Sequence, residues 1–221
     1  MAAAKIVLFT MLCFCVCANA QTQTLAVYPS HADQLNSMTT HSLNLELKRL
    51  LSPAGIDLEW RSHDRNATVP SVEGRLIVGT FEGGCSTESL SAMQGVGPHA
   101  RTLAETSISG DRILPYFTLD CTHLIRMLNP LLQPLSVPMR ERILGRALAR
   151  VIAHEIYHIV ADTTEHEEAG LAKAQLSARE LAAERFDLSP ASLQRIRAAY
   201  RVGPPAIPIV RLMPPPAAQR R

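Results

Sequence analysis

The chain has 221 residues, of which 47% are hydrophobic and 19% are charged, and its 22 basic and 20 acidic side chains leave a formal net charge of +2. This length allows one domain with a sizeable core, and the composition excludes a wholly disordered chain. A charge near zero and an aromatic share of only 5% argue against a dedicated nucleic-acid-binding protein, which needs a basic surface and rings on which bases stack.

The first twenty residues have the layout of a secretory signal peptide. A single cation, Lys5, precedes an apolar run from Ile6 to Cys17, and Ala18-Asn19-Ala20 supplies the small residues of a cleavage site. The run is too short to cross a bilayer, which takes about 20 residues. We therefore predict residues 1–20 as a leader, Gln21 as the first mature residue, a secreted or periplasmic location and no membrane span in the mature chain.

Removal of the leader changes the cysteine count. Of the 5 cysteines, Cys85 and Cys121 remain in the mature chain. Exported proteins meet an oxidising environment, so this isolated pair predicts a disulfide. Closing the loop between the two residues would stabilise the fold by about 3–4 kcal/mol in the chain-entropy model. The leader also removes one cation, which leaves the mature chain with a net charge of +1.

The mature domain is expected to span residues 21–202, with a sheet lobe at 21–160. The hydrophobic pattern predicts, in chain order, a strand at 24–28, a helix at 38–51, strands at 56–61, 75–81, 103–108 and 113–119, and a helical segment at 122–128 that leads into Asn129-Pro130. Pro138 then begins the strongest helix of the sequence, which runs to about Val160. Its apolar face is broad, so we expect this helix to be mostly buried.

A small, mainly helical C-terminal lobe is expected at 161–202. A polar loop at 161–170 precedes helices near 171–176, 178–186 and 190–201. From Gly203 the chain is rich in proline and arginine. Such a tail cannot be helical, and we expect residues 203–221 to be extended or disordered.

The predicted buried helix carries the sequence HEIYH at residues 154–158, an H-E-x-x-H motif. Positions i and i+4 share one face of a helix, so the imidazoles of His154 and His158 can reach one metal ion. Zinc suits two such nitrogens and leaves room for a third protein ligand and a water molecule. Glu155 lies beside that face, where its carboxylate can take a proton from a metal-activated water. Without a metal, two imidazoles and a carboxylate would be costly to bury.

Several side chains that follow the helix are candidates for the third ligand. His166 is our first choice, because it is a third imidazole placed where the helix should already have ended and where the chain can fold back. Glu180 or Glu184 is the alternative, since a carboxylate from a following helix can complete a His/His/Glu site. Asp162 or another acid stays open as well.

The segment HEIYHIVADTTEH resembles the motif H-E-x-x-H-x-x-G-x-x-H of the metzincins, a group of zincin metallopeptidases. The resemblance implies an α+β fold: a twisted, mixed and mostly parallel β-sheet with an antiparallel edge strand along which substrate lies, an active-site helix and one catalytic zinc. The chain departs from the family at Ala161, where the family has glycine, and at His166, which comes two residues after the family position, Thr164. The family's methionine turn has no clear match.

We therefore predict a secreted zinc metalloendopeptidase, a hydrolase that cleaves polypeptides with a metal-activated water and Glu155 as the general base. The predicted ligands of Zn²⁺ are His154, His158 and His166. Two alternatives stay open. One is a non-catalytic, secreted metal-binding or interaction module on the same fold, and the other is a zinc amidohydrolase that acts on cell-wall material.

Overall fold

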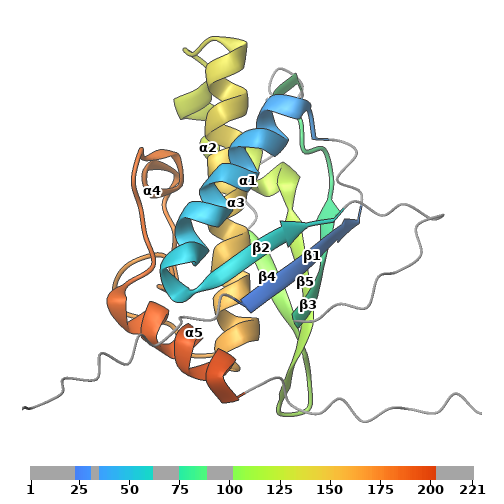
Figure 1. Cartoon of the computed structure of the whole chain (residues 1–221). Helices are drawn as coiled ribbons and strands as arrows, with labels where there is room; N and C mark the ends of the chain where they lie inside the picture. The colour runs from blue at the N-terminus through green and yellow to red at the C-terminus, as the bar shows by residue number, and fades with distance from the viewer. Residues whose placement is uncertain (1–22, 31–34, 62–74, 89–101, 203–221) are drawn as a thin grey trace, which may run out of the picture.

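The computed structural model describes residues 23–30, 35–61, 75–88 and 102–202. The leader and the proline-rich tail that the sequence predicts lie outside these described residues. Within them the chain has a mixed α+β structure in which helices pack on a β-sheet (Figure 1). None of the described helices combines the length and the hydropathy that crossing a membrane requires.

Five strands form one sheet in the described part of the chain, in the order β2-β1-β3-β5-β4. They are β1 (Gln23–Ser30), β2 (Ile56–Trp60), β3 (Arg75–Glu82), β4 (Ala104–Ser109) and β5 (Arg112–Asp120). β1 pairs in parallel with β2 and β3, and β3 pairs in parallel with β5, whereas β4 lies antiparallel to β5 at one edge. The expectation of a mostly parallel sheet with an antiparallel edge strand is confirmed.

The pairing of β4 with β5 is interrupted by a bulge. Thr106 faces Phe117, but Ile108 faces Ile113, so that one residue of β4 lies opposite three residues of β5. Pro115, which has no N–H to donate to the ladder, is among these three. A bulge bends a strand and redirects its side chains. The extra residues lie on β5, directly beside the edge strand β4 that borders the candidate site.

The hydrophobic core lies between the sheet and two long helices, α1 (Ser37–Leu51) and α3 (Val137–Ala161). Alternate residues of the strands point to one face of the sheet. Ile77 and Phe81 of β3 and Phe117 and Leu119 of β5 are buried there and belong to one cluster with apolar residues of both helices. The sequence pattern predicts a buried α3, and the structure packs it on this face.

α1 and α3 approach each other closely at Gly145. A Cβ atom built on Gly145 would lie only 2.4 Å from the carbonyl oxygen of Thr39 and 2.8 Å from Cβ of Ser42. Atoms of the backbone and of a short side chain cannot move away easily, so the position tolerates only a hydrogen side chain. Glycine therefore sets the distance between the two helices.

The remaining described elements are α2 (Cys121–Leu132), α4 (Ala178–Ala182), α5 (Pro190–Val202) and a 3-10 turn, η2 (Ser52–Ala54). The sequence predicts that the helical segment after β5 ends at Leu128, but α2 continues to Leu132 with Pro130 inside it. Leu124, Leu128 and Leu132 form a fully buried stripe. Burial of this stripe outweighs the hydrogen bond that the proline cannot make.

The predicted helix at 171–176 is wrong. The segment is a loop that contains a turn. The N–H group of Leu171 donates to the carbonyl oxygen of Asp187 at 2.9 Å, and its carbonyl oxygen is paired with a side chain of α3 described below. Backbone groups that a helix would use internally are thus bonded to distant parts of the chain.

Cys85 and Cys121 are brought together, as predicted. Cys85 and Cys121 are buried and form a disulfide, with their Cα atoms 5.0 Å apart. The bond joins the segment after β3 to the first residue of α2 and closes the loop that contains β4 and β5. In the unfolded chain this bond reduces the number of conformations open to the segment that contains β4 and β5.

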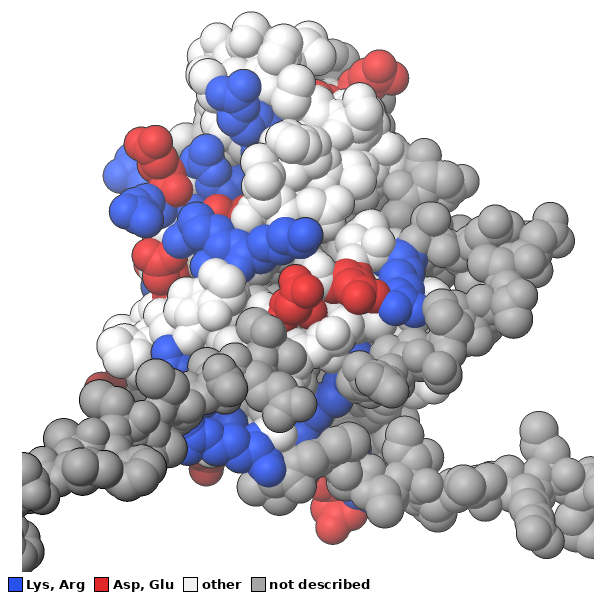
Figure 2. All heavy atoms as spheres, in the orientation of Figure 1, with Lys and Arg blue, Asp and Glu red and all other residues white. Residues whose placement is uncertain are grey.

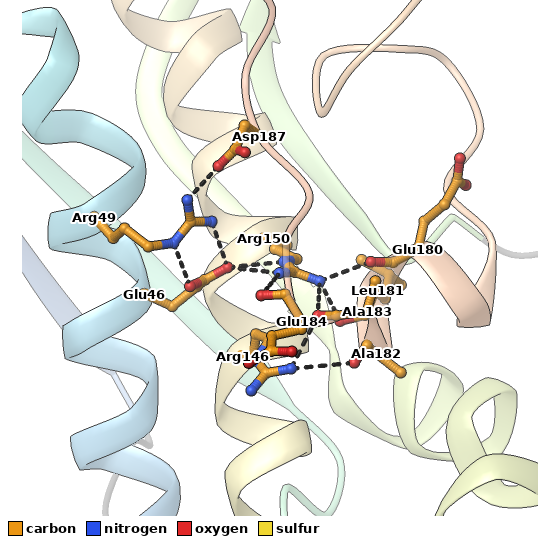
Figure 3. A network of polar contacts seen from close by, with 10 residues as sticks. All are labelled: Glu46, Arg49, Arg146, Arg150, Glu180, Leu181, Ala182, Ala183, Glu184 and Asp187. Atoms are coloured by element: carbon orange, nitrogen blue, oxygen red, sulfur yellow. Dashed lines mark hydrogen bonds and ion pairs between the residues drawn. The ribbon is translucent and has the colours of Figure 1, made fainter.

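A fully buried arginine joins α1, α3 and the C-terminal segment (Figure 3). The guanidinium of Arg150 lies 2.8 Å from Oε1 of Glu46 on α1, and the Arg150 side chain is 0% exposed. Its other N–H groups donate to the carbonyl oxygens of Glu180, Leu181, Ala183 and Glu184. Because these carbonyls accept from a side chain, α4 ends at Ala182 rather than near residue 186, where the sequence predicts its end.

The charge of this buried network is balanced. Burial alone would raise the pKa of Glu46, but the hydrogen bond from Arg49 and the charge of Arg150 outweigh it and lower the pKa. Arg49 also pairs with Asp187, which extends the network toward the loop before α5. A buried ion pair of this kind is costly to break, since the loss of one partner leaves uncompensated polar groups.

The surface charge is mixed on the face drawn in Figure 2. Basic and acidic side chains lie close to one another there, and neither sign forms a continuous field across that face. On this side of the molecule acidic and basic side chains thus occur in small mixed groups, in keeping with the near-zero net charge of the chain. The expectation that the protein does not bind nucleic acid stays a prediction.

We expect Arg150→Met to lower the free energy of unfolding by about 3–5 kcal/mol, because the change leaves several buried carbonyl oxygens without donors. Urea denaturation followed by circular dichroism measures the loss. The matched control is Arg49→Met in the same network, whose side chain is 31% exposed and whose loss should cost about 1 kcal/mol. Equal losses for the two variants would contradict the role assigned to burial.

Gly145→Ala should destabilise the protein by about 1–3 kcal/mol, because the added methyl group overpacks the contact between α1 and α3. Helix propensity alone predicts the opposite sign, a gain of about 1 kcal/mol for alanine over glycine inside a helix. The sign of the change in the urea midpoint therefore decides between the two effects. Leu45→Ala, at a position of α1 that is 58% exposed, is the control and should change stability by less than about 0.5 kcal/mol.

Candidate metal centre

Three imidazoles meet where α3 ends and the following loop begins. The Nε2 atoms of His154 and His158, one helical turn apart on α3, lie 3.1 Å from each other. The ring centre of His166 lies 5.3 Å from that of His154 and 4.8 Å from that of His158. One ring nitrogen from each residue lies within 4.8 Å of the other two. The three predicted ligands are thus brought together in a group that could hold a metal ion.

The end of α3 explains why the third histidine comes late in the sequence. The helix continues through Ala161, where the family motif has glycine, and ends at Asp162 in a left-handed conformation with φ of 49°. Aspartate tolerates this conformation better than most residues. The N–H groups of Asp162 and Thr163 both donate to the carbonyl oxygen of His158. The left-handed residue therefore lies one position after that of the glycine in the motif that the sequence resembles, and His166 follows it after three residues.

The carboxylates considered as alternative ligands do not join this group among the described residues. The Glu180 side chain accepts from Lys173 at 2.6 Å and forms a capping box with Ser177 at the start of α4. The carbonyl oxygen of Glu184 accepts from Arg150, and the backbone of Asp162 caps α3. The sequence favoured Glu180 and Glu184 over Asp162 as alternatives to His166, and the structure bonds the Glu180 carboxylate to Lys173 and Ser177 instead.

Each helical histidine is oriented by a backbone carbonyl on the other side of its ring. Nδ1 of His154 lies 2.8 Å from the carbonyl oxygen of Leu171, and Nδ1 of His158 lies 2.7 Å from that of Thr163. A carbonyl only accepts, so each Nδ1 carries the proton and each Nε2 presents a lone pair. Both carbonyls belong to the loop after α3. The same loop thus carries the third imidazole and orients the other two.

Burial lowers the pKa of both His154 and His158, against the opposing effect of their carbonyl partners. The two rings are therefore neutral near pH 7, with their protons on Nδ1. Their Nε2 lone pairs then face each other at 3.1 Å with no proton between them. The two nitrogens cannot form a hydrogen bond without a proton, whereas a metal cation between the rings can bind both lone pairs. Imidazole nitrogens suit zinc, copper, iron and nickel, so the donor set fits a transition metal ion.

Glu155 lies beside the three imidazoles and is 4% exposed. Burial raises the pKa of its carboxyl group, and a hydrogen bond from Thr106 opposes that rise. The Thr106 hydroxyl, on the edge strand β4, donates to Oε2 of Glu155 at 2.6 Å. The contact fixes one carboxylate oxygen against β4, beside the bulge.

A cleft of about 720 Å³ opens onto the site and is lined by the three histidines and Glu155. The edge strand β4 contributes Glu105 and Thr106 to its lining, and the loop after α3 contributes residues 174–176. The centre is therefore accessible to a molecule that lies along the edge of the sheet. A site with an accessible cleft is more typical of catalysis than a closed structural metal site.

Sequence reasoning missed the groups that support the imidazoles. Backbone carbonyls such as those of Leu171 and Thr163 have no signature in a sequence, because every residue carries one. Thr106 could not be found either, since only the pairing of β4 with β5 brings it to Glu155 across 49 residues. The signal available in the sequence was limited to side chains on one helix and the loop directly after it.

Comparisons of the chain with protein-family models, with curated proteins and with solved structures find no match. The function is therefore inferred from the residues and geometry of this chain. Two observations carry it: the His154, His158 and His166 group that could hold a metal ion, and the adjoining cleft with a buried glutamate.

His166→Ala should weaken binding of Zn²⁺, used as the probe, by at least about 100-fold, because loss of a direct ligand exceeds the effect of losing an outer partner. Competition with a chromophoric chelator measures the dissociation constant. Glu180→Gln removes the main alternative ligand and should leave zinc affinity unchanged within about twofold, since the side chain is held by Lys173 and Ser177. The reverse order of effects would assign the third ligand to Glu180.

Proposed function

We propose that the protein is an exported zinc metallopeptidase of the zincin type, similar to the metzincins, that hydrolyses polypeptides. The observation that carries the proposal is the convergence of two imidazoles of α3 and a third from the loop beside the buried Glu155, on a cleft bordered by the sheet edge. Three nitrogen ligands and an accessible cleft are typical of catalytic rather than structural zinc sites.

His154, His158 and His166 would hold the zinc ion. When bound, zinc polarises a substrate carbonyl and lowers the pKa of a water molecule. The carbonyls of Leu171 and Thr163 keep the two helical rings in the correct tautomer and orientation. Three imidazoles suit several transition metal ions. We choose zinc among them because a site with three histidine ligands can bind zinc and activate a water molecule for hydrolysis.

Glu155 would be the general base. Its burial raises its pKa, which makes the carboxylate a stronger base and allows it to hold a proton before passing it to the leaving amine. Thr106 holds Oε2, so Oε1 is the oxygen we assign to proton transfer. Glu155 directly follows His154 and is bonded to β4, so its carboxylate lies between a proposed metal ligand and the strand along which we place the substrate.

The edge of the sheet supports a polypeptide as the substrate. β4 is a terminal strand of the sheet, paired only with β5 in the described residues, and it contributes to the lining of the cleft. An extended peptide can add to an open sheet edge through main-chain hydrogen bonds. The disulfide pair and the predicted leader support an extracytoplasmic location, secreted or periplasmic.

Glu155→Gln should lower kcat on a peptide substrate by about 10²–10⁴-fold, the range that a general base contributes. Zinc affinity should stay close to that of the wild type, because glutamine keeps the shape of the side chain and the three imidazoles remain. Profiling of peptide libraries beside cell-wall fragments supplies the substrate and separates a peptidase from an amidohydrolase.

Glu82→Gln is the matched control, since Glu82 is an exposed residue of β3 that does not line the cleft, and its kcat should change by less than about threefold. Full activity of Glu155→Gln would overturn the assigned base. A purified wild-type protein that binds no zinc would overturn the proposed function as a whole.

A further inference from the structure

The third histidine is held less firmly by its surroundings than the other two. His154 and His158 lie on a buried helix, whereas His166 is an exposed residue of the loop after α3. A ligand on a loop must be ordered before it can bind, and ordering one residue costs about 1–2 kcal/mol of backbone entropy. The affinity of the site therefore depends on what holds this loop in place.

Two acids flank His166 in the sequence, and both pair with one arginine of α5. Nη1 of Arg195 lies 3.3 Å from Oε2 of Glu165, and Nε of Arg195 lies 3.3 Å from Oε1 of Glu167. The guanidinium thus contacts the residue on each side of the third histidine. An arginine suits this role because its planar group presents several N–H donors in fixed directions.

A buried tyrosine of α3 also contacts Glu167. The hydroxyl of Tyr157, on α3 directly before His158, donates to the same Oε1 of Glu167 at 3.2 Å. Tyr157 is 0% exposed, and the Glu167 side chain is only 17% exposed. The N–H group of Glu167 also donates to the carbonyl oxygen of Ala172 at 2.9 Å. Glu167 therefore connects the loop to both α3 and α5.

The two contacts of Arg195 differ in strength. The Glu165 side chain is 75% exposed, and an ion pair in that position contributes little. Glu167 is largely shielded from solvent and shares its Oε1 between Arg195 and Tyr157. We therefore expect most of the effect of Arg195 to pass through Glu167.

We propose that Arg195 and Tyr157 are positioning residues for the metal site: through Glu167 they hold the loop so that His166 stays beside His154 and His158. The proposal rests on the proposed function, because it takes the three histidines as ligands of one ion. It assigns to α5, which supplies none of the three, an indirect role in retaining the metal through the contact of Arg195 with Glu167.

Two effects of removing Arg195 have opposite signs, which makes the proposal testable. Arg195 carries a positive charge, so by electrostatics alone Arg195→Gln should strengthen the binding of a divalent cation. Loss of positioning should weaken it, and changes in outer partners of metal ligands typically cost 10–100-fold in affinity. Tyr157→Phe removes the second contact to Glu167 without changing the charge of the protein.

The experiment measures the dissociation constant of Zn²⁺ by chelator competition on the full mature chain. We expect Arg195→Gln and Tyr157→Phe each to weaken zinc binding by about 10-fold. Arg197→Gln is the matched control: it removes the same charge from the same helix, but Arg197 contacts the carbonyl oxygen of Pro53 instead of the loop. Its zinc affinity should be unchanged or slightly higher.

Two further readouts separate positioning from a general loss of structure. The melting temperatures of the metal-free variants should match that of the wild type within a few degrees, because Arg195 is 47% exposed. The visible spectrum of the Co²⁺-loaded wild type should show tetrahedral coordination, and Arg195→Gln should lose part of that intensity. Neither signal depends on catalysis.

Zinc affinity of Arg195→Gln equal to or higher than that of the wild type would overturn the positioning role, and so would an equal loss in Arg197→Gln. These outcomes leave the proposed function standing if the wild type binds zinc. A wild type that binds no zinc overturns both proposals. A wild type that binds zinc but cleaves no peptide overturns the proposed activity and still allows the zinc measurement to decide on Arg195.

Discussion

The buried guanidinium of Arg150 is the constraint from which the arrangement of this molecule follows. A charge without solvent must have all its donors bonded, and Arg150 meets this demand with Glu46 of α1 and four carbonyl oxygens of the C-terminal segment. It lies one helical turn before His154. The interaction that joins α1 to residues 180–184 therefore also holds this segment close to the helix that carries the histidines.

The loop after α3 brings together the three imidazoles that could hold a metal ion. It ends the helix at Asp162, orients His158 through the carbonyl of Thr163, supplies His166, and orients His154 through the carbonyl of Leu171. The loop can do so because some of its backbone groups bond to α3 and to Asp187, while a bond within it, from the N–H group of Glu167 to the carbonyl oxygen of Ala172, holds its shape. The loop has no regular hydrogen-bond pattern, so its structure could not be predicted from the sequence. For the same reason its carbonyl groups are available to orient the histidines.

The successes and failures of sequence analysis have a common physical basis. The helix at residues 137–161, the strands and the cysteine pair were predictable because periodicity and composition report on local structure and burial. The segment 171–176 looked helical by its apolar content but is a loop, and α2 passes through Pro130 because three buried leucines outweigh one missing hydrogen bond. Thr106 and Arg195 were out of reach, since each contacts the site only through tertiary packing.

The sequence by itself determined that His154 and His158 share one helical face with Glu155 beside them, because a spacing of four residues matches the helical repeat. It also determined the choice of candidates for the third ligand, but not which of them reaches the site. Tertiary structure decided that choice: Glu180 is bonded to Lys173, Asp162 caps the helix, and His166 folds back. The reason is that a short helical motif is set by local geometry, whereas a loop is placed by the distant groups that bond to its backbone.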